Sequence, residues 1–279
     1  MAAIITGSDS GIGKATAVGL ARRGAGLALV CRDPGRGDAT VNEIRRTTGN
    51  DAVRLFVADL ASQQAIRSLA GELLAAYPAL HVLVNNAGVV NLQRTTTVDG
   101  IETVLAVNHL AYYLLTRLLL DRLAASGRAR VVNVASDAHR FVRTLDLDDL
   151  GWAQRRWRTM RVYGASKLAN ILFTYELARR LEGRDVTANC LHPGAVATGL
   201  GKNNGAIARI LVGALRPFFR TPDDGAATSI HLAASPEVEG VSGAYFADAK
   251  PARTSPASYD EALARRLWDA SAAMVGLAP

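Results

Sequence analysis

The segment AIITGSDSGIGKAT, residues 3–16, passes from an apolar run through a glycine-rich turn into a helix-forming run. The turn contains Gly7, Gly11 and Gly13 in the spacing TGxxxGxG. Glycines let the backbone turn tightly and approach an anion, while the first turn of the following helix supplies free N–H groups and positive potential. A tight turn without a ligand is the alternative for this motif alone, but its place between a strand and a helix favours a pyrophosphate site.

Short apolar runs alternate with longer amphipathic runs along nearly the whole chain. Helical spacing is present in GIGKATAVGLARRG, ASQQAIRSLAGELLAAY and YGASKLANILFTYELARRLEG. The expected strands are Ala2–Thr6, Leu27–Cys31, Val53–Ala58, His81–Asn85, Arg130–Ala135, Val186–Leu191 and Ser242–Phe246. This alternation predicts an α/β fold, a Rossmann-type doubly wound parallel sheet of about seven strands with helices on both faces.

The sequence shows no internal repeat, low-complexity tract or linker. We therefore expect a single domain over residues 1–279, with a cofactor half near 1–135 and a catalytic half near 136–279. Two segments, Leu145–Arg161 and Thr198–Pro222, escape the alternation. Long irregular segments in such a domain are typical of lids or binding loops.

The composition limits the classes of function. With 279 residues, 49% of them hydrophobic, the chain can bury a sizeable core. The net charge of +7 does not predict nucleic-acid binding, because the arginines are scattered singly; it suits an anionic cofactor.

Three features bear on cellular location. The two cysteines, Cys31 and Cys190, have no partner motif, which favours reduced thiols. The longest apolar run, LAVNHLAYYLLTRLLLDRLAA, is interrupted by charged and polar residues and predicts a buried helix instead of a membrane span. The glycine turn begins within seven residues of Met1, so we expect no signal peptide, no integral membrane anchor and a cytoplasmic protein.

The stretch VCRDPGRG, after the second expected strand, bears on the choice of cofactor. Dinucleotide folds place a ribose-contacting residue about 20 positions beyond the glycines, where both Arg32 and Asp33 lie. An acid would bind the ribose hydroxyls of NAD, whereas an arginine would bind the 2′-phosphate of NADP. Arg32 is the first polar side chain after the strand, with Arg36 as a second cation. The sequence thus favours NADP(H) over NAD(H), unless Arg32 is only a surface charge.

Asp9 brings a negative side chain into the glycine turn. The simplest account is that its oxygens bond local backbone N–H groups. The alternative places Asp9 near Arg32, where it either pairs with that arginine and orients it or repels a 2′-phosphate.

Tyr163 and Lys167 are four residues apart on an expected helix and so share one face. A free tyrosine has a pKa of about 10, and a nearby ammonium would lower that pKa toward the working range of a general acid or base. Ser136, after the expected strand that includes RVVNVA, is placed to hold a substrate oxygen. Each signal alone can arise by chance on a structural helix or loop, but together they favour catalysis.

These motifs resemble those of the short-chain dehydrogenases/reductases over nearly the whole chain. The resemblance rests on TGSDSGIG at 6–13, NNAG at 85–88, Asn108, Ser136, YGASK at 163–167 and HPG at 192–194. VNHL, SKLANILFTYELARRL and LARRLWD look like the retinol dehydrogenase group, which mostly prefers NADP(H). Its animal members often have a membrane anchor, which we do not carry over.

The resemblance implies roles for individual residues. Tyr163 would be the general acid/base, Ser136 would polarise the carbonyl, Lys167 would bind the nicotinamide ribose, and Asn108 would hold a water linked to Lys167. The implied cofactor-binding residues are Gly7, Asp9, Ser10, Gly11, Ile12, Gly13, Arg32, Asp59, Leu60, Asn86, Ala87, Gly88, Tyr163, Lys167, Pro193, Gly194, Val196 and Thr198.

The resulting prediction is an NADP(H)-dependent oxidoreductase that interconverts a hydrophobic aldehyde or ketone and its alcohol, with no metal. The alternatives are an NAD(H)-dependent alcohol dehydrogenase and a non-catalytic dinucleotide-binding sensor or scaffold. The apolar run 207–219 and the tryptophans Trp152 and Trp157 suggest an apolar substrate or, equally, a subunit interface. A homodimer or homotetramer, as is common in the family, would pair the helices expected over Glu102–Ala124 and Tyr163–Leu181.

Overall fold

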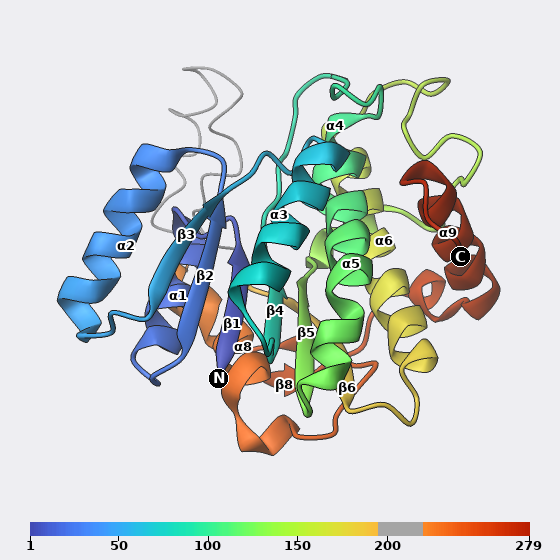
Figure 1. The fold of residues 1–279 in the computed structure, drawn as a ribbon. Coiled ribbons are helices and arrows are strands. Elements are labelled where there is room, and N and C mark those ends of the chain that lie inside the picture. The colour runs from blue at the N-terminus through green and yellow to red at the C-terminus, as the bar shows by residue number, and fades with distance from the viewer. Residues whose placement is uncertain (195–219) are drawn as a thin grey trace.

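A computed structural model describes residues 1–194 and 220–279. Its described residues form an eight-stranded sheet in the order β3-β2-β1-β4-β5-β6-β7-β8, in which only β8 is antiparallel (Figure 1). The strands are β1 (Ala2–Thr6), β2 (Gly26–Cys31), β3 (Val53–Val57), β4 (Val82–Asn85), β5 (Ala129–Val134), β6 (Val186–His192), β7 (Tyr245–Ala247) and β8 (Lys250–Pro251).

The strand order reverses beside β1, because the chain moves outward from β1 to β3 and then returns to β4 on the other side. Ligands of doubly wound sheets bind at such a reversal, beyond the carboxyl ends of the strands. The Thr6 hydroxyl joins the two strand ends here, since it accepts hydrogen bonds from the backbone N–H of Asn86 (2.9 Å) and of Ala87 (3.1 Å).

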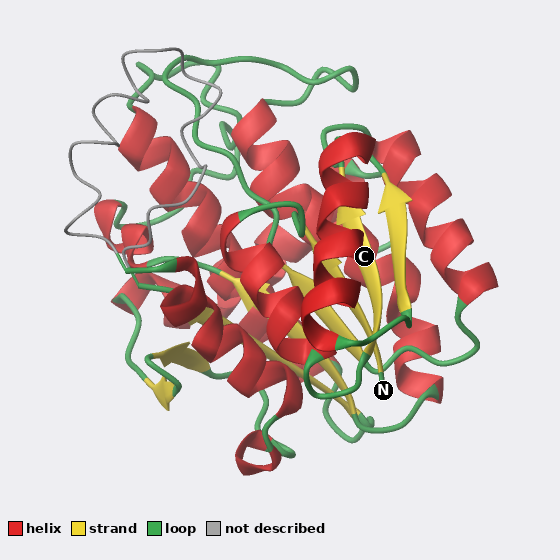
Figure 2. Ribbon diagram, turned by 90° about the vertical axis from the view of Figure 1, so that its left-hand side faces the viewer, coloured by secondary structure: helices red, strands yellow, loops and turns green. Residues whose placement is uncertain are grey.

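Helices cover both faces of the sheet, as Figure 2 shows. They are α1 (Gly11–Ala21), α2 (Pro34–Thr48), α3 (Gln63–Ala76), α4 (Thr103–Leu105), η1 (Ala106–Leu110), α5 (Ala111–Ala125), η2 (Asp137–Phe141), α6 (Thr159–Arg180), α8 (Pro222–Ala234), η5 (Pro236–Val238), η6 (Pro256–Tyr259) and α9 (Glu261–Met274).

Alternating side chains of the strands supply two separate cores. Ile4 of β1 packs in the cluster that contains α3, α5 and α6, whereas the adjacent Ile5 packs in the cluster that contains α1, α2 and α8. The strands β1, β2, β4, β5 and β6 are buried on both faces, which explains their continuous apolar runs, whereas the edge strands β3 and β8 have exposed residues.

The predicted fold class is confirmed, with differences at its edges. The strand expected at Ser242–Phe246 begins at Tyr245, because Gly243 has a positive φ of 72° and interrupts the extended backbone. The sheet has an additional two-residue strand, β8, that the apolar pattern could not indicate.

The helix expected at Glu102–Ala124 is divided into α4, the π-helical turn η1 and α5. Among the described residues, Thr103–Ala125 is the one stretch long and apolar enough to cross a membrane. Buried core helices pass the same criterion, and α5 packs in the core beside α3. The prediction of a buried helix is confirmed.

The segment Leu145–Arg161 is anchored although it is irregular up to residue 158. The Asp149 carboxylate accepts hydrogen bonds from Ala153 N (2.6 Å) and Arg155 Nε (2.8 Å). Trp152 is buried against Val104 and Val162. The other irregular segment, Thr198–Pro222, and its apolar run 207–219 lie outside the described residues, except for residues 220–222.

Candidate active site

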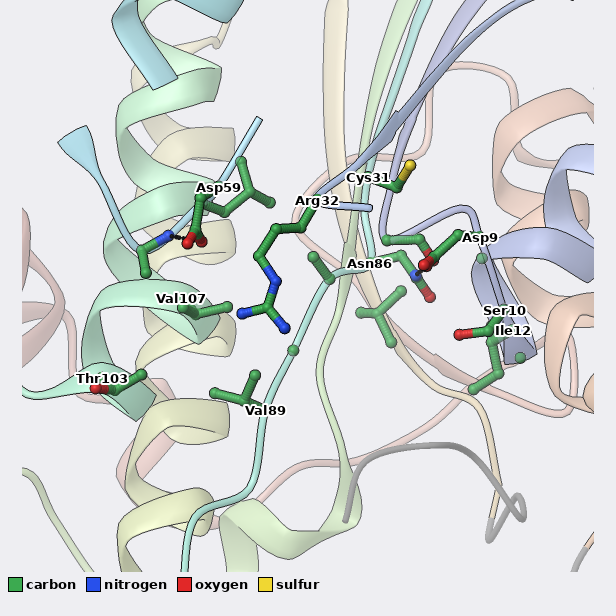
Figure 3. A pocket seen from close by; sticks show the side chains of 18 of the residues that line it. Asp9, Ser10, Ile12, Cys31, Arg32, Asp59, Asn86, Val89, Thr103 and Val107 are labelled. Atoms are coloured by element: carbon green, nitrogen blue, oxygen red, sulfur yellow. Dashed lines mark hydrogen bonds between the residues drawn. The ribbon is translucent and has the colours of Figure 1, made fainter. Parts of the chain in front are cut away.

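A cavity of about 520 Å³ lies at the carboxyl ends of β1, β2 and β4 (Figure 3). It brings residues together from both halves of the sequence. Of the predicted site residues, those lining it are Gly7, Asp9, Ser10, Gly11, Ile12, Gly13, Arg32, Asp59, Leu60, Asn86, Ala87, Gly88, Tyr163, Lys167 and Pro193.

The glycine turn has the geometry of an anion cradle. Gly7 and Gly11 have positive φ angles of 65° and 54°. A Cβ on Gly13 would lie 2.1 Å from the carbonyl oxygen of Gly7, so no larger residue fits there without movement of the backbone. Ser10 is the N-cap residue of α1, yet its side chain makes no capping hydrogen bond, which leaves the first N–H groups of the helix for a ligand.

Asn86, the residue after β4, supports this turn. Its Nδ2 donates to the carbonyl oxygens of Thr6 (2.8 Å) and Gly7 (3.2 Å). The NNAG motif therefore supports the turn as well as lining the cavity.

The residues after β2 differ from the sequence expectation in one respect. The Asp9 carboxylate pairs with Arg36 Nη2 at 2.8 Å, so the ion pair of Asp9 is made with Arg36 and not, as the alternative interpretation of Asp9 had it, with Arg32. Arg36 is also held by Asp33, which caps α2 by accepting from Arg36 N (3.0 Å) and lies 3.4 Å from Arg36 Nε. Asp33 has these local partners, while the Arg32 side chain extends into the cavity toward Val89 (Figure 3).

Asp59 and Leu60 both line the cavity, and Figure 3 shows Asp59 on the side opposite Asp9 of the glycine turn. Asp59 Oδ1 accepts a hydrogen bond from Ala61 N (2.9 Å). The side chain is thereby fixed where the resemblance places the adenine.

Tyr163 and Lys167 face the cavity from α6, one helical turn apart. Lys167 Nζ donates to the carbonyl oxygen of Val134 (2.8 Å) and lies 5.6 Å from the centre of the Tyr163 ring. Burial lowers the pKa of Lys167 to about 7. It raises the pKa of Tyr163 to about 12, against the opposing hydrogen bond with Ser136. The expected lowering of the tyrosine pKa by Lys167 is wrong for this structure, because desolvation of the phenolate outweighs it.

Ser136 is the N-cap residue of η2, and its Oγ accepts from Ala138 N (3.2 Å). Its side chain is hydrogen-bonded to Tyr163, which lines the cavity, while Ser136 itself is not among the lining residues.

Asn108 lies in the π-helical turn η1. Its Oδ1 accepts from Val89 N (2.7 Å), and its Nδ2 donates to Val89 O (3.0 Å) and Ser166 Oγ (3.0 Å). Asn108 thus holds the segment after NNAG against α6, and its expected role of binding a water stays a prediction. Gly88 packs closely against it, since a Cβ there would already be in van der Waals contact with Asn108 Oδ1, at 3.4 Å.

At the far end of β6, Pro193 lines the cavity. Gly194 does not, and it has a φ of 82° with Arg220 beside it. The predicted residues Val196 and Thr198 lie outside the described residues.

The sequence reasoning missed part of the cavity wall. Val89 could have been identified from the sequence, because it directly follows the NNAG motif. No sequence motif marks Thr103 and Val107, which the fold brings to the cavity from α4 and η1. The missed lining residues are Val30, Cys31, Ala58, Ala61, Val89, Asn91, Leu92, Gln93, Thr95, Thr103, Val107, Val134 and Ala135.

Both cysteines are free and buried. In residues 1–194 and 220–279, no three His, Cys, Asp or Glu side chains gather to form a metal site. The glycine turn, the uncapped N-terminus of α1 and a cavity that extends past Gly88 to Tyr163 fit an extended dinucleotide.

Comparison with known proteins agrees with this geometry. The family model for short chain dehydrogenases matches residues 1–146 and 150–207. The chain is 43% identical to retinol dehydrogenase 13 of Homo sapiens, over 98% of this chain and 84% of that protein. It is 44% identical to retinol dehydrogenase 14 of Mus musculus, over 98% and 85%.

Solved structures give the same result. A crystal structure of an uncharacterised protein from Mycobacterium paratuberculosis is similar with a TM-score of 0.79 and 32% identity, covering 99% of this chain and 93% of that one. A short chain dehydrogenase from Burkholderia cenocepacia in complex with NADP is similar with a TM-score of 0.69 and 29% identity, covering 88% and 94%.

Proposed function

Since the chain belongs to the short-chain dehydrogenase family of oxidoreductases, we propose that it interconverts a hydrophobic aldehyde or ketone and its alcohol with NADP(H). The observation that carries the proposal is the shared cavity. The anion cradle of the glycine turn and the Tyr163–Lys167 pair line one space, although they lie 150 residues apart in the sequence.

In the reducing direction, Tyr163 donates a proton to the carbonyl oxygen as negative charge develops there. With a pKa of about 12, the tyrosine is fully protonated at neutral pH and ready to act as the acid. Ser136 donates a hydrogen bond to the same oxygen, and Lys167 binds the nicotinamide ribose. When bound, the cofactor supplies the hydride.

Arg32 supports the preference for NADP(H). Its guanidinium extends into the cavity, while Asp33 is engaged in capping α2 and in pairing with Arg36. A cation that reaches the ribose side favours a 2′-phosphate, and an acid engaged elsewhere is a poor ligand for ribose hydroxyls. NAD(H) is the second candidate, favoured by the negative charges of Asp9 and Asp33.

An apolar substrate is supported by exposed side chains near the catalytic tyrosine. Leu92 lines the cavity, and its carbonyl oxygen accepts from Thr159 beside Met160. Leu92, Phe141 and Met160 are each more than half exposed. Apolar groups exposed beside a site suit an apolar ligand, and the similar proteins named above are retinol dehydrogenases.

We also propose a cytoplasmic location and a homodimer or homotetramer. In the described structure, however, α9 packs Leu263 and Leu267 in one cluster with Leu168 and Leu172 of α6. This apolar face of α6 is not free for a second copy, so pairing through α6 would use other side chains.

Initial rates on a panel of apolar aldehydes and ketones, with NADPH and NADH in parallel, test the proposal. We expect reduction of several apolar carbonyls with a lower KM for NADPH. NADPH binding without oxidation on the whole panel would contradict it and favour a non-catalytic sensor.

A further inference from the structure

Two histidines contact the peptide group that follows Ser136. The carbonyl oxygen of this group belongs to Ser136 and lies 2.7 Å from His139 Nδ1. Its N–H belongs to Asp137, which donates to His192 Nδ1 at 3.3 Å. The two imidazoles therefore bond opposite edges of one peptide plane.

The partners of the rings define which nitrogens carry protons. Ser255 N donates to His139 Nε2 (3.0 Å), so the ring proton of His139 is on Nδ1 and is donated to Ser136 O. His192 accepts at Nδ1, so its proton is on Nε2, which lies 3.7 Å from Asp137 Oδ2. Both imidazoles bond this peptide in their neutral forms.

The bonds tie Ser136 to distant parts of the fold. His139 is fully buried in η2, whereas His192 is the last residue of β6 and precedes Pro193 of the cavity wall. The Asp137 carboxylate is held as well, since it accepts from Tyr245 of β7 (2.9 Å). Without these bonds, the loop that carries Ser136 after β5 would be positioned only by the short helix η2.

We propose that His139 and His192 are positioning residues, which clamp the Ser136–Asp137 peptide and so hold the Ser136 hydroxyl against Tyr163. The role rests on the proposed function, because Ser136 acts on substrate only if the protein is a carbonyl reductase. Neither histidine lines the cavity, so they act through Ser136.

The clamp makes the proposed reaction sensitive to acid. Protonation of His192 puts a hydrogen on Nδ1, which then faces the N–H of Asp137 and can no longer accept from it. The clamp is therefore complete above the pKa of His192 and opens as pH falls through it. Burial lowers that pKa below its ordinary value of about 6.5.

Other groups near His192 modify this pKa without changing the sign. Asp137 and Asp248 raise it, while Arg220, which is paired with Asp248, lowers it. His139 is coupled to His192 electrostatically, and both are neutral in the clamp. Within residues 1–194 and 220–279, the other titratable groups that contact Asp137 are Tyr245 and, at 3.8 Å, Arg140.

A comparison of variants is needed to assign the acid limb. Tyr163, with a pKa of about 12, stays protonated across this range, but Lys167, with a pKa of about 7, also titrates near it. A fall of kcat for reduction at acid pH is therefore assigned to the clamp only where a non-titrating residue at position 192 removes it.

The test compares His192→Leu, which removes the acceptor, with His192→Asn, whose side-chain oxygen can accept without titrating. We expect His192→Leu to lower kcat on the order of tenfold at neutral pH, with NADPH affinity within about twofold of wild type. His192→Asn should rescue kcat to within about threefold and lose the acid limb. Unchanged kcat in His192→Leu, or an acid limb that persists in His192→Asn, overturns the positioning role.

A second measurement does not depend on activity. In the wild-type protein, the NMR chemical shift of the Asp137 amide should follow the titration of His192, and in His192→Asn it should not. If the chemical shift of the Asp137 amide in the wild-type protein does not change as His192 titrates, the clamp is overturned. If the wild type reduces no carbonyl, the proposed function fails, and the amide titration alone decides whether the clamp exists.

Discussion

The two ends of the cavity are built in opposite ways. At the phosphate end, a short run of consecutive residues presents backbone groups, and the glycines at 7 and 13 let the turn pack closely against itself and against residues 86–87. At the catalytic end, side chains from separate elements converge on one point, with Tyr163 and Lys167 almost fully buried. The phosphate end depends on the absence of side chains. The catalytic end depends on burial, which raises the pKa of Tyr163 and lowers that of Lys167. A substitution should therefore act by steric clash at one end and by loss of chemistry at the other.

Tyr163→Phe should have the largest effect. Loss of the general acid is expected to lower kcat for carbonyl reduction by about 10²–10⁴-fold, because Tyr163 faces the cavity and its raised pKa keeps its hydroxyl proton in place at neutral pH. NADPH binding, followed by fluorescence titration, should be retained. Near-normal turnover in this variant would contradict the assigned mechanism.

Gly13→Ala tests the steric end. The added Cβ would lie 2.1 Å from Gly7 O, so we expect a loss of stability of about 1–3 kcal/mol and weak NADPH binding. Thermal unfolding and cofactor titration measure the two effects. Gly71→Ala is the matched control, because a Cβ at Gly71 in α3 meets no atom within 4 Å and should leave binding unchanged. Equal behaviour of the two variants would refute the cradle.

Arg32→Ala separates the cofactors. If Arg32 binds the 2′-phosphate, its removal should raise KM for NADPH by about 10- to 100-fold, the value of a hydrogen bond to a charged group. KM for NADH should change little, since NADH has no phosphate at that position. A similar rise of KM for NADPH and for NADH would show that Arg32 does not determine the preference between them.

Asp9→Asn should have the smallest effect. Because Asp9 pairs with Arg36, its neutralisation frees this second arginine and removes a negative charge from the cavity wall. We expect KM for NADPH to fall by up to about fivefold, in line with a partly exposed ion pair. Asp38→Asn, on the exposed side of α2, controls for net charge. A higher KM for NADPH in Asp9→Asn alone would show that Arg36 needs Asp9 to bind the phosphate.

The phosphate end was predictable from the sequence because it is local. Its spacing, its preceding strand and its following helix lie within residues 2–21, and the glycines report backbone conformations that few other residues adopt. The alternation of apolar runs likewise predicted the parallel sheet, since strands buried on both faces must be continuously apolar. The order of the strands and the short antiparallel β8 depend on pairing between distant segments.

Only the tertiary structure decided how the charged and polar groups pair. The sequence placed Asp9, Arg32 and Arg36 close together, but the pairing of Asp9 with Arg36 depends on how α2 leaves β2. The sequence also indicated Tyr163 and Lys167, yet the direction of their pKa shifts follows from burial, which spacing along a helix does not report. His139 and His192 meet at one peptide because β5 and β6 are neighbours in the sheet. Local spacing thus determined which chemical groups are present, and long-range packing determined their partners, their solvation and their protonation.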